Sequence, residues 1–426
     1  MRILWQSSTP ECVSGYGNAS REAIKRLVAD GHFVRIATKH PHSSGWSHWP
    51  VPETDKCIEI CDGTNIRFLN EMIEEEKFDL IYSLWDIWGL RGKRYPTPDR
   101  WLAHIPVDTE KIHNALAEVS RAPGVVAAMS RHGERELKSL GLAPLYAPLG
   151  IDTKKFRFKP EARAAVREQL GLGDGDFLLG TVGLNYQDDR KNFINLFRAF
   201  AKFRDDMRTA HGIRAFLFLH TAANENDTYP DEINYKRIID KVGIADAVFF
   251  PLPQGAYMMG RLDEDFMADI YSAMDAYIQP SKGEGFGLPL IEAHACGLPT
   301  AATDTTSMPE LAGPLGWKYT IKTDEFGDMV YLGAADGWRT VPRPPAILSA
   351  LDAIFRDWLD AYSRPLKDTR DLYRQWAVEN YDWDAVWPAW QAMFGEADRR
   401  LSEMRQRGKI AAEPSATPEI EGGGAE

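Results

Sequence analysis

Residues 276–297 read AYIQPSKGEGFGLPLIEAHACG, and this stretch decides the fold that the sequence predicts. An apolar run is followed by a glycine-rich turn and by a short apolar segment that ends at Gly297. That order is typical of a strand, a turn and a helix in an α/β domain. Glycines let a backbone approach a ligand closely, and a helix N-terminus carries a partial positive charge. The turn at Gly285, Phe286 and Gly287 is therefore predicted to bind phosphate or pyrophosphate.

Two glutamates, Glu284 and Glu292, bracket this turn. If most of the span between them is helical, their separation is roughly 12 Å, about the length of a nucleotide diphosphate moiety. One carboxylate could then contact a sugar and the other a ribose. A structural interpretation explains the spacing equally well, because glycine-rich turns are common in α/β proteins and acidic residues favour a helix N-terminus. The spacing alone leaves both interpretations open.

The sequence on either side alternates between apolar runs and helical periodicity. At 426 residues the chain exceeds one ordinary core, so two domains are expected. Strands are predicted in the first half at residues 2–8, 31–37, 78–84, 101–107 and 125–129, with a helix at 19–29. Strands are predicted in the second half at residues 177–183, 215–220, 247–250 and 276–279, with a helix at 289–296. The predicted fold class is α/β, with two parallel-sheet domains and a cleft available between them.

Composition changes give the expected domain limits. A loop-rich stretch between residues 144 and 175 places the boundary near 150, with a first domain at 1–150 and a second at 151–380. Trp383, Trp387, Trp390 and Phe394 recur at helical spacing, which predicts a C-terminal helix over 381–408 whose aromatic face packs in a core. Residues 409–426 are rich in Ala, Glu, Pro, Ser and Gly, and we expect a disordered tail there.

The bulk composition excludes several partners. A net charge of −12 opposes binding to nucleic acid or to anionic lipid, although a local basic groove remains compatible with it. The 4 cysteines show no paired metal-ligand spacing, and no apolar run is long enough to span a membrane. A cytoplasmic protein without a metal is expected. The oligomeric state is not indicated.

The motif around Glu284 resembles a known family. From about Asp269 to Leu311 the chain resembles the donor-binding segment of family 4 retaining glycosyltransferases, whose hallmark is two glutamates separated by seven residues that include Gly-Phe-Gly-Leu-Pro. Thinner similarities lie at Gly31-His-Phe-Val, Leu149-Gly-Ile-Asp152, Thr181-Val-Gly183 and Tyr381-Asp-Trp383. The resemblance implies the GT-B fold, in which two Rossmann-like domains face each other across a cleft and a terminal helix, here residues 381–408, packs back towards the first domain. It also implies transfer of a sugar from a UDP- or GDP-sugar to an acceptor hydroxyl with retention of configuration, without a cofactor.

The same resemblance assigns roles to residues. Glu284 would hold sugar hydroxyls or support the cationic anomeric carbon, and Glu292 would accept hydrogen bonds from the ribose. The other residues implied in donor binding are Gly183, Arg190, Lys191, Gly285, Phe286, Gly287 and Leu288. Leu184 stands where the family usually has a phosphate-binding arginine, and Arg190 is the best substitute. A solvated helix start is the alternative for both Arg190 and Lys191.

Candidates also lie in the first half. Gly15, Tyr16 and Gly17 follow the first strand, and either a ligand-facing loop or a structural turn explains them. The family has a histidine near the fourth strand that contacts the donor sugar, which makes His104 and Asp108 catalytic candidates. A histidine on an apolar strand is more often a core residue.

Other functions stay open. A GT-B phosphorylase, hydrolase or epimerase would share the donor site, and a sugar- or nucleotide-binding protein without catalysis would explain Leu184. A glycosidase has no use for a phosphate-binding turn between its carboxylates. An NAD-dependent oxidoreductase is disfavoured because neither opening strand is followed by Gly-Xaa-Gly-Xaa-Xaa-Gly. The acceptor cannot be identified from the sequence.

Overall fold

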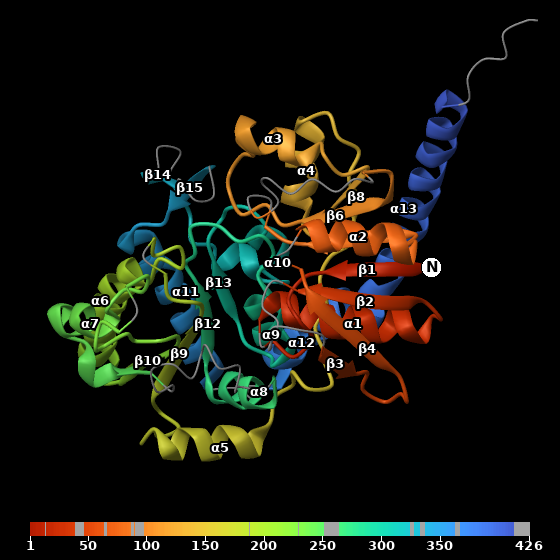
Figure 1. Ribbon diagram of the computed structural model, residues 1–426. Helices are drawn as coiled ribbons and strands as arrows, with labels where there is room; N and C mark the ends of the chain where they lie inside the picture. Colours follow the sequence, from red (N-terminus) through yellow and green to blue (C-terminus); the bar gives the residue numbers. More distant parts are fainter. Residues whose placement is uncertain are drawn as a thin grey trace, which may run out of the picture.

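A computed structural model gives the structure of this chain. It describes residues 1–12, 14–38, 47–63, 66–86, 89, 98–186, 188–228, 230–250, 264–323, 328–332, 337–362 and 367–412. Within these residues the strands form an eight-stranded sheet, a five-stranded sheet and a two-stranded hairpin, with helices beside both larger sheets (Figure 1). We call the part that carries the first sheet the N-terminal part, and the part that carries the second sheet and the hairpin the C-terminal part.

The first sheet has the strand order β3-β4-β2-β1-β5-β6-β7-β8. All neighbouring strands in it are parallel except the edge pair β3 and β4. Its central strands are buried on both faces, as parallel sheets covered by helices are. Its elements are β1 (Arg2–Gln6), α1 (Gly15–Ala29), β2 (Phe33–Thr38), β3 (Ser47–Pro50), β4 (Cys57–Asp62), α2 (Ile66–Glu76), β5 (Leu80–Leu84), η2 (Pro98–Arg100), β6 (Trp101–Ile105), α3 (Asn114–Ser120), β7 (Val125–Ala128), α4 (Arg131–Ser139) and β8 (Leu145–Tyr146).

The second sheet is parallel throughout, in the order β11-β10-β9-β12-β13. It is preceded by α5 (Pro160–Gln169). Its elements are β9 (Phe177–Val182), α6 (Phe193–His211), β10 (Ala215–His220), α7 (Tyr235–Val242), η3 (Ala245–Ala247), β11 (Val248–Phe249), α8 (Glu264–Ala273), β12 (Ala276–Gln279), α9 (Leu288–Ala295), β13 (Thr300–Ala302), α10 (Met308–Leu311) and η4 (Gly316–Lys318). The antiparallel hairpin of β14 (Asp328–Leu332) and β15 (Gly337–Val341) follows. The chain then continues through α11 (Pro344–Tyr362), α12 (Lys367–Tyr381) and α13 (Trp383–Ala412).

The predicted α/β class with two parallel sheets is confirmed, and several local predictions need correction. Helix α1 begins at Gly15, so Gly15, Tyr16 and Gly17 form its first turn rather than a loop. The Ser14 side chain accepts a hydrogen bond from the Gly17 N–H and caps this turn. Helix α9 begins only at Leu288, so half of the span from Glu284 to Glu292 is not helical and the 12 Å figure does not apply.

The C-terminal helix packs against the N-terminal sheet. In α13 the side chains of Trp383, Trp390 and Phe394 are buried, and the rings of Trp390 and Trp5 are 6.4 Å apart between centroids. The Trp390 indole donates to the Pro148 carbonyl at 2.7 Å. The helix continues to Ala412, past the predicted end at 408, and residues 413–426 of the expected tail lie outside the described residues.

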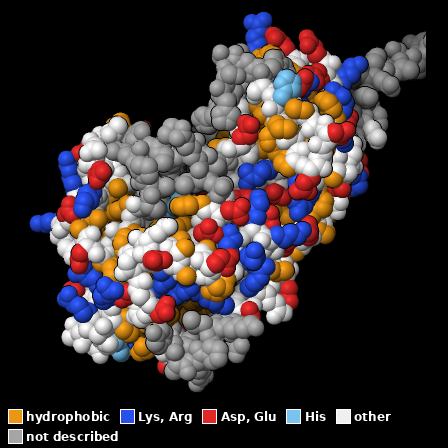
Figure 2. Space-filling view, turned by 90° about the horizontal axis from the view of Figure 1, so that it is seen from below, with side chains coloured by type: hydrophobic (Ala, Val, Ile, Leu, Met, Phe, Trp, Pro, Cys, Tyr) orange, Lys and Arg blue, Asp and Glu red, His pale blue; other side chains and the backbone are white. Residues whose placement is uncertain are grey.

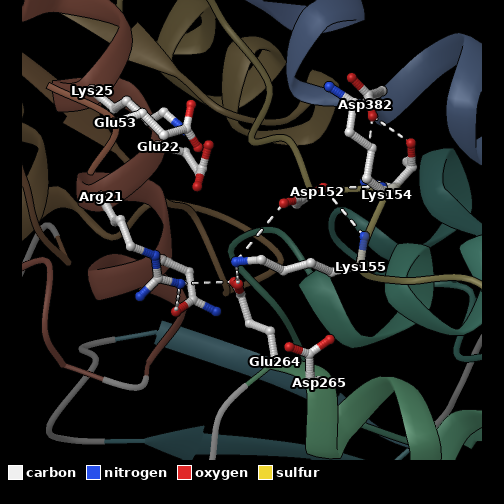
Figure 3. Close-up of polar contacts among 12 residues, drawn as sticks. Arg21, Glu22, Lys25, Glu53, Asp152, Lys154, Lys155, Glu264, Asp265 and Asp382 are labelled. Atoms are coloured by element: carbon white, nitrogen blue, oxygen red, sulfur yellow. Dashed lines mark hydrogen bonds and ion pairs between the residues drawn. The ribbon is translucent and has the colours of Figure 1, made fainter. Parts of the chain in front are cut away.

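The chain passes between the two parts at two places that lie side by side. The Ile151 N–H donates to the Tyr381 carbonyl at 2.9 Å, and the Trp383 N–H donates to the Ile151 carbonyl at 3.1 Å. Beside this crossing, Arg21 of α1 and Lys155 both contact Glu264 at the start of α8, each at 2.8 Å (Figure 3). This network joins the N-terminal part to the C-terminal part.

Candidate functional site

The Glu284 carboxylate lies just after β12 and is almost fully buried, with 8 % of its side chain exposed. The Lys191 ammonium contacts its Oε1 at 2.6 Å, and the Arg190 guanidinium contacts its Oε2 at 2.7 Å. Gln279, the last residue of β12, donates its amide N–H to Oε1 at 2.9 Å. We call Glu284, Arg190, Lys191 and Gln279 the Glu284 site.

The charge of Glu284 follows from these partners. Burial alone would raise the pKa of the Glu284 carboxyl, but Arg190 and Lys191 outweigh it and hold that pKa well below its ordinary value. Glu284 is therefore ionised at neutral pH. The site combines one fixed negative charge with two cations in a buried environment, where electrostatic interactions are stronger than in water.

Three predicted glycines are needed for local geometry. Gly287 has φ +120°, a left-handed conformation that favours glycine, and it caps the start of α9. A Cβ on Gly183 would lie 2.7 Å from Cγ of Lys191, so Gly183 leaves room for that lysine to reach Glu284. A Cβ on Gly285 would lie 2.5 Å from Cβ of Pro106, which follows β6 in the N-terminal part. The turn therefore lies directly against the other part.

The segment after β13 braces the turn. The Thr306 hydroxyl accepts from the Glu284 N–H at 3.0 Å, and the Ser307 hydroxyl donates to the Glu284 carbonyl at 2.9 Å. Phe286 and Leu288, both predicted as donor-binding residues, are buried in the main hydrophobic cluster. Their side chains support the turn, while its backbone remains the candidate for ligand contact.

Glu292 lies on α9 and is buried. Its partner is Tyr271, whereas Glu284 is held by two cations. The Tyr271 hydroxyl donates to Glu292 Oε2 at 2.8 Å. Burial and, to a smaller extent, the charge of Glu264 raise the pKa of Glu292 to about 7, although the hydrogen bond from Tyr271 acts to lower it. The two glutamates of the motif thus differ in protonation, because one has two cationic partners and the other has a phenol.

This pKa predicts a pH-dependent effect of Glu292→Gln on stability. A carboxyl with a folded-state pKa of about 7 and an ordinary value of 4.5 lowers the stability of the wild-type protein as pH rises through that window. The variant lacks this loss, so we expect it to gain up to roughly 3 kcal/mol at pH 8 and little at pH 5. Urea unfolding at both pH values measures the gain. Glu379→Gln, at an exposed position, is the control, and an equal gain at both pH values would refute the assignment.

Acidic and basic groups from the N-terminal part and the hairpin lie next to the Glu284 site. The Tyr16 hydroxyl donates to Asp86 Oδ1 at 2.7 Å, and Arg339 of β15 pairs with Asp108. Burial and, to a smaller extent, the charge of Asp108 raise the pKa of Asp86 to about 6. The charge of Arg190 opposes this rise, which places Asp86 within electrostatic reach of the Glu284 site.

Asp86 and Arg339 were not predicted from the sequence. Asp86 follows the buried strand β5, and an acidic residue after an apolar run was a usable signal. Arg339 lies 55 positions after Glu284 in a hairpin without a recognisable motif, so no local pattern indicates it. Gly15 lies against the glycine-rich turn, because a Cβ there would lie 3.3 Å from the Leu288 side chain at the start of α9.

The structure places His104 inside the N-terminal part. Its Nδ1 lies 2.8 Å from the Tyr82 hydroxyl, and its ring centroid lies 5.3 Å from that of Trp390. Burial lowers its pKa to about 4, so the ring is neutral at physiological pH. The residue at this strand end that contacts the glycine-rich turn is Pro106, which the prediction overlooked. These contacts favour the core interpretation of His104, whereas Asp108 lies beside the site.

Two features are lacking in the residues that the structure describes. Among those residues, no three His, Cys, Asp or Glu side chains form a cluster that could hold a metal ion. No helix in the described part of the chain is long and apolar enough to cross a bilayer. Figure 2 shows a face on which Lys and Arg side chains are interspersed with Asp and Glu.

The sequence is similar to known glycosyltransferases. Residues 177–328 match the family model described as "Glycosyl transferases group 1". A D-inositol 3-phosphate glycosyltransferase from Actinosynnema mirum is 28% identical over 262 residues, which are 55% of this chain and 58% of that protein. The match therefore spans little more than half of that relative. A D-inositol 3-phosphate glycosyltransferase 2 from Catenulispora acidiphila is 29% identical over 385 residues, 82% of this chain and 84% of that protein.

Solved structures share the fold. A sucrose-phosphate synthase from Thermosynechococcus elongatus superposes with a TM-score of 0.63 at 19% identity, covering 97% of this chain and 100% of that one. The Anabaena protein HepE in complex with UDP-glucose superposes with a TM-score of 0.57 at 14% identity, covering 96% of this chain and 100% of that one.

Proposed function

We propose that this chain, which matches the group 1 glycosyltransferase model over residues 177–328 and shares the GT-B fold of its structural neighbours, transfers a sugar from a UDP- or GDP-sugar to an acceptor hydroxyl with retention of configuration. The observation that carries the proposal is the buried Glu284 carboxylate held between Arg190 and Lys191. A solved neighbour, HepE, binds UDP-glucose, which supports a nucleotide sugar as the donor class.

The proposed chemistry follows the charges that develop. As the bond between the anomeric carbon and the phosphate oxygen breaks, negative charge grows on the diphosphate and positive charge grows on the carbon. Arg190 and Lys191 have further N–H groups besides those that contact Glu284, and these would stabilise the leaving diphosphate. The ionised Glu284 would stabilise the cationic carbon. Because the two cations supply the positive charge, the transfer is proposed to need no divalent metal.

The remaining groups divide between donor and acceptor. Glu292 would accept hydrogen bonds from the ribose hydroxyls, in addition to the one from Tyr271. On the other side either Asp86 or Asp108 would accept the hydrogen bond of the hydroxyl that attacks the anomeric carbon and take up its proton as the glycosidic bond forms. Their carboxylates come from the N-terminal part, so donor and acceptor would be held by different parts of the chain.

A panel of nucleotide sugars tests this function. The protein is incubated with UDP- and GDP-linked glucose, mannose and N-acetylglucosamine, together with simple sugars, inositol and inositol 3-phosphate as acceptors. Released nucleotide and glycosylated product are followed by chromatography and mass spectrometry. We expect one donor to give both products in equal amounts. Tight nucleotide binding with neither product across the panel would instead support a binding protein, and nucleotide release without a glycoside would support a hydrolase.

A further inference from the structure

The β14–β15 hairpin exposes an aromatic surface beside the site. Seven large hydrophobic side chains are exposed among the described residues, and three of them lie in this hairpin. They are Met329, Tyr331 and Trp338, with exposed fractions of 51%, 43% and 48%. The family match ends at residue 328, where β14 begins, so the hairpin lies outside it. Exposed aromatic groups concentrated in one short element indicate a binding surface.

The hairpin has two different faces. Tyr331 and Trp338 are directly opposite each other across the two strands, so their side chains lie on the same face. Their rings are 5.4 Å apart in an edge-to-face arrangement. Arg339, the next residue along β15, points to the other face, is 4 % exposed and pairs with Asp108. One face therefore reaches toward the Glu284 site while the other presents two aromatic rings.

Hydrogen bonds to Glu110 hold the hairpin next to the segment that carries Asp108. The Glu110 N–H donates to the Trp338 carbonyl at 2.9 Å, and the Thr340 hydroxyl donates to a Glu110 carboxylate oxygen at 2.5 Å. A Cβ on Gly337 would lie 2.5 Å from Cγ2 of Thr109. The aromatic pair is thus continuous with the segment that carries Asp108, a group proposed to contact the acceptor hydroxyl.

We propose that Tyr331 and Trp338 form a subsite for a pyranose ring of a carbohydrate acceptor, an inference that rests on the proposed transferase function. The C–H face of a pyranose is weakly positive and apolar, and it stacks on the negative face of an aromatic ring. The hydroxyl edge of the same sugar would reach the carboxylate of Glu110, which accepts from Thr340 on the same face of β15 as Trp338. An acceptor of one or more sugar units therefore matches both kinds of group.

The charges near the hairpin argue against a lipid surface. Anionic bilayers attract clusters of Lys and Arg, whereas the cations here are paired with acids, as Arg343 is with Asp328 at 2.7 Å and Arg339 with Asp108. The net charge of −12 acts in the same direction. A neutral carbohydrate is not repelled by this negative charge.

The test compares Trp338→Ala and Tyr331→Ala with Phe33→Ala, which removes an exposed aromatic ring at the start of β2. The probes are methyl α-D-glucopyranoside, methyl α-D-mannopyranoside and maltotriose, observed by saturation-transfer NMR on the full chain. We expect ring-proton signals from at least one probe with the wild type and Phe33→Ala. The two hairpin variants should bind that probe about tenfold more weakly, while their affinity for UDP or GDP stays unchanged and shows that they are folded.

Three outcomes would overturn the subsite. These are equal saccharide binding by Trp338→Ala and wild type, no signal from any probe with the wild type, and loss of binding to phosphatidylglycerol vesicles in the variants without a change in saccharide binding. Failure of the transferase function would look different. In that case saccharide binding would still depend on Trp338, but no nucleotide sugar would yield a glycoside.

Discussion

Glu284→Gln is expected to lower kcat at least about a hundredfold, because it removes the negative charge that stabilises the cationic anomeric carbon. The amide keeps the size of the side chain, and its single oxygen can still accept a hydrogen bond from either Lys191 or Arg190. Binding of free UDP or GDP should therefore change much less than turnover. Steady-state kinetics with the donor found in the panel, together with calorimetric nucleotide binding, separate the two effects.

The control for this variant is Glu292→Gln, which is proposed to weaken donor binding more than turnover. Removing one member of a buried ion pair also costs up to about 3 to 5 kcal/mol of stability. Thermal unfolding must accordingly show that Glu284→Gln is folded at the assay temperature. A kcat within threefold of the wild type in the folded variant would eliminate the proposed role of Glu284.

Lys191→Met is expected to weaken binding of UDP or GDP by about ten- to a hundredfold, since hydrogen bonds to charged groups contribute roughly 1.5–3 kcal/mol each. The methionine retains the apolar stem that passes Gly183 and loses only the ammonium group. Binding of uridine or guanosine, which carry no phosphate, should change little. Calorimetry with the nucleoside and with the diphosphate measures the difference.

Lys282→Met is the matched control, because Lys282 is also largely buried nearby but contacts the Asp188 carbonyl at 2.9 Å rather than Glu284. It should leave the preference for the diphosphate almost intact. If the two variants weaken diphosphate binding equally, the preference for the diphosphate over the nucleoside does not depend on Lys191. If Lys191→Met weakens nucleoside and diphosphate alike, its effect is structural.

The position of the glycine-rich turn and its two glutamates could be predicted because these residues are contiguous in sequence. Glu284, the glycines and Glu292 lie within nine residues, and a strand followed by a helix necessarily brings such a segment to one edge of the sheet. The different states of the two glutamates could not be predicted. They depend on Arg190 and Lys191 on one side and on Tyr271 on the other, which only the folded chain brings into contact.

The positions of the residues that the N-terminal part brings to the site depend on long-range packing. His104 and Pro106 are two positions apart, and only the structure shows that His104 packs against Trp390 of α13 while Pro106 contacts Gly285. The strand pattern of alternating faces does not say which face α13 covers. Arg339 reaches Asp108 across 231 positions of sequence. The sequence carries no local signal for such a contact.

The proposed reaction is retaining transfer of a sugar from a nucleotide donor at the Glu284 site. Proton NMR of a reaction in progress, with an α-linked nucleotide sugar and an acceptor from the panel, tests it most directly through the configuration of the first glycoside formed. We expect an α-glycoside that appears together with free nucleotide and that forms at least about a hundredfold more slowly with Glu284→Gln. A β-glycoside, or an α-glycoside formed equally fast by Glu284→Gln, would contradict the proposal.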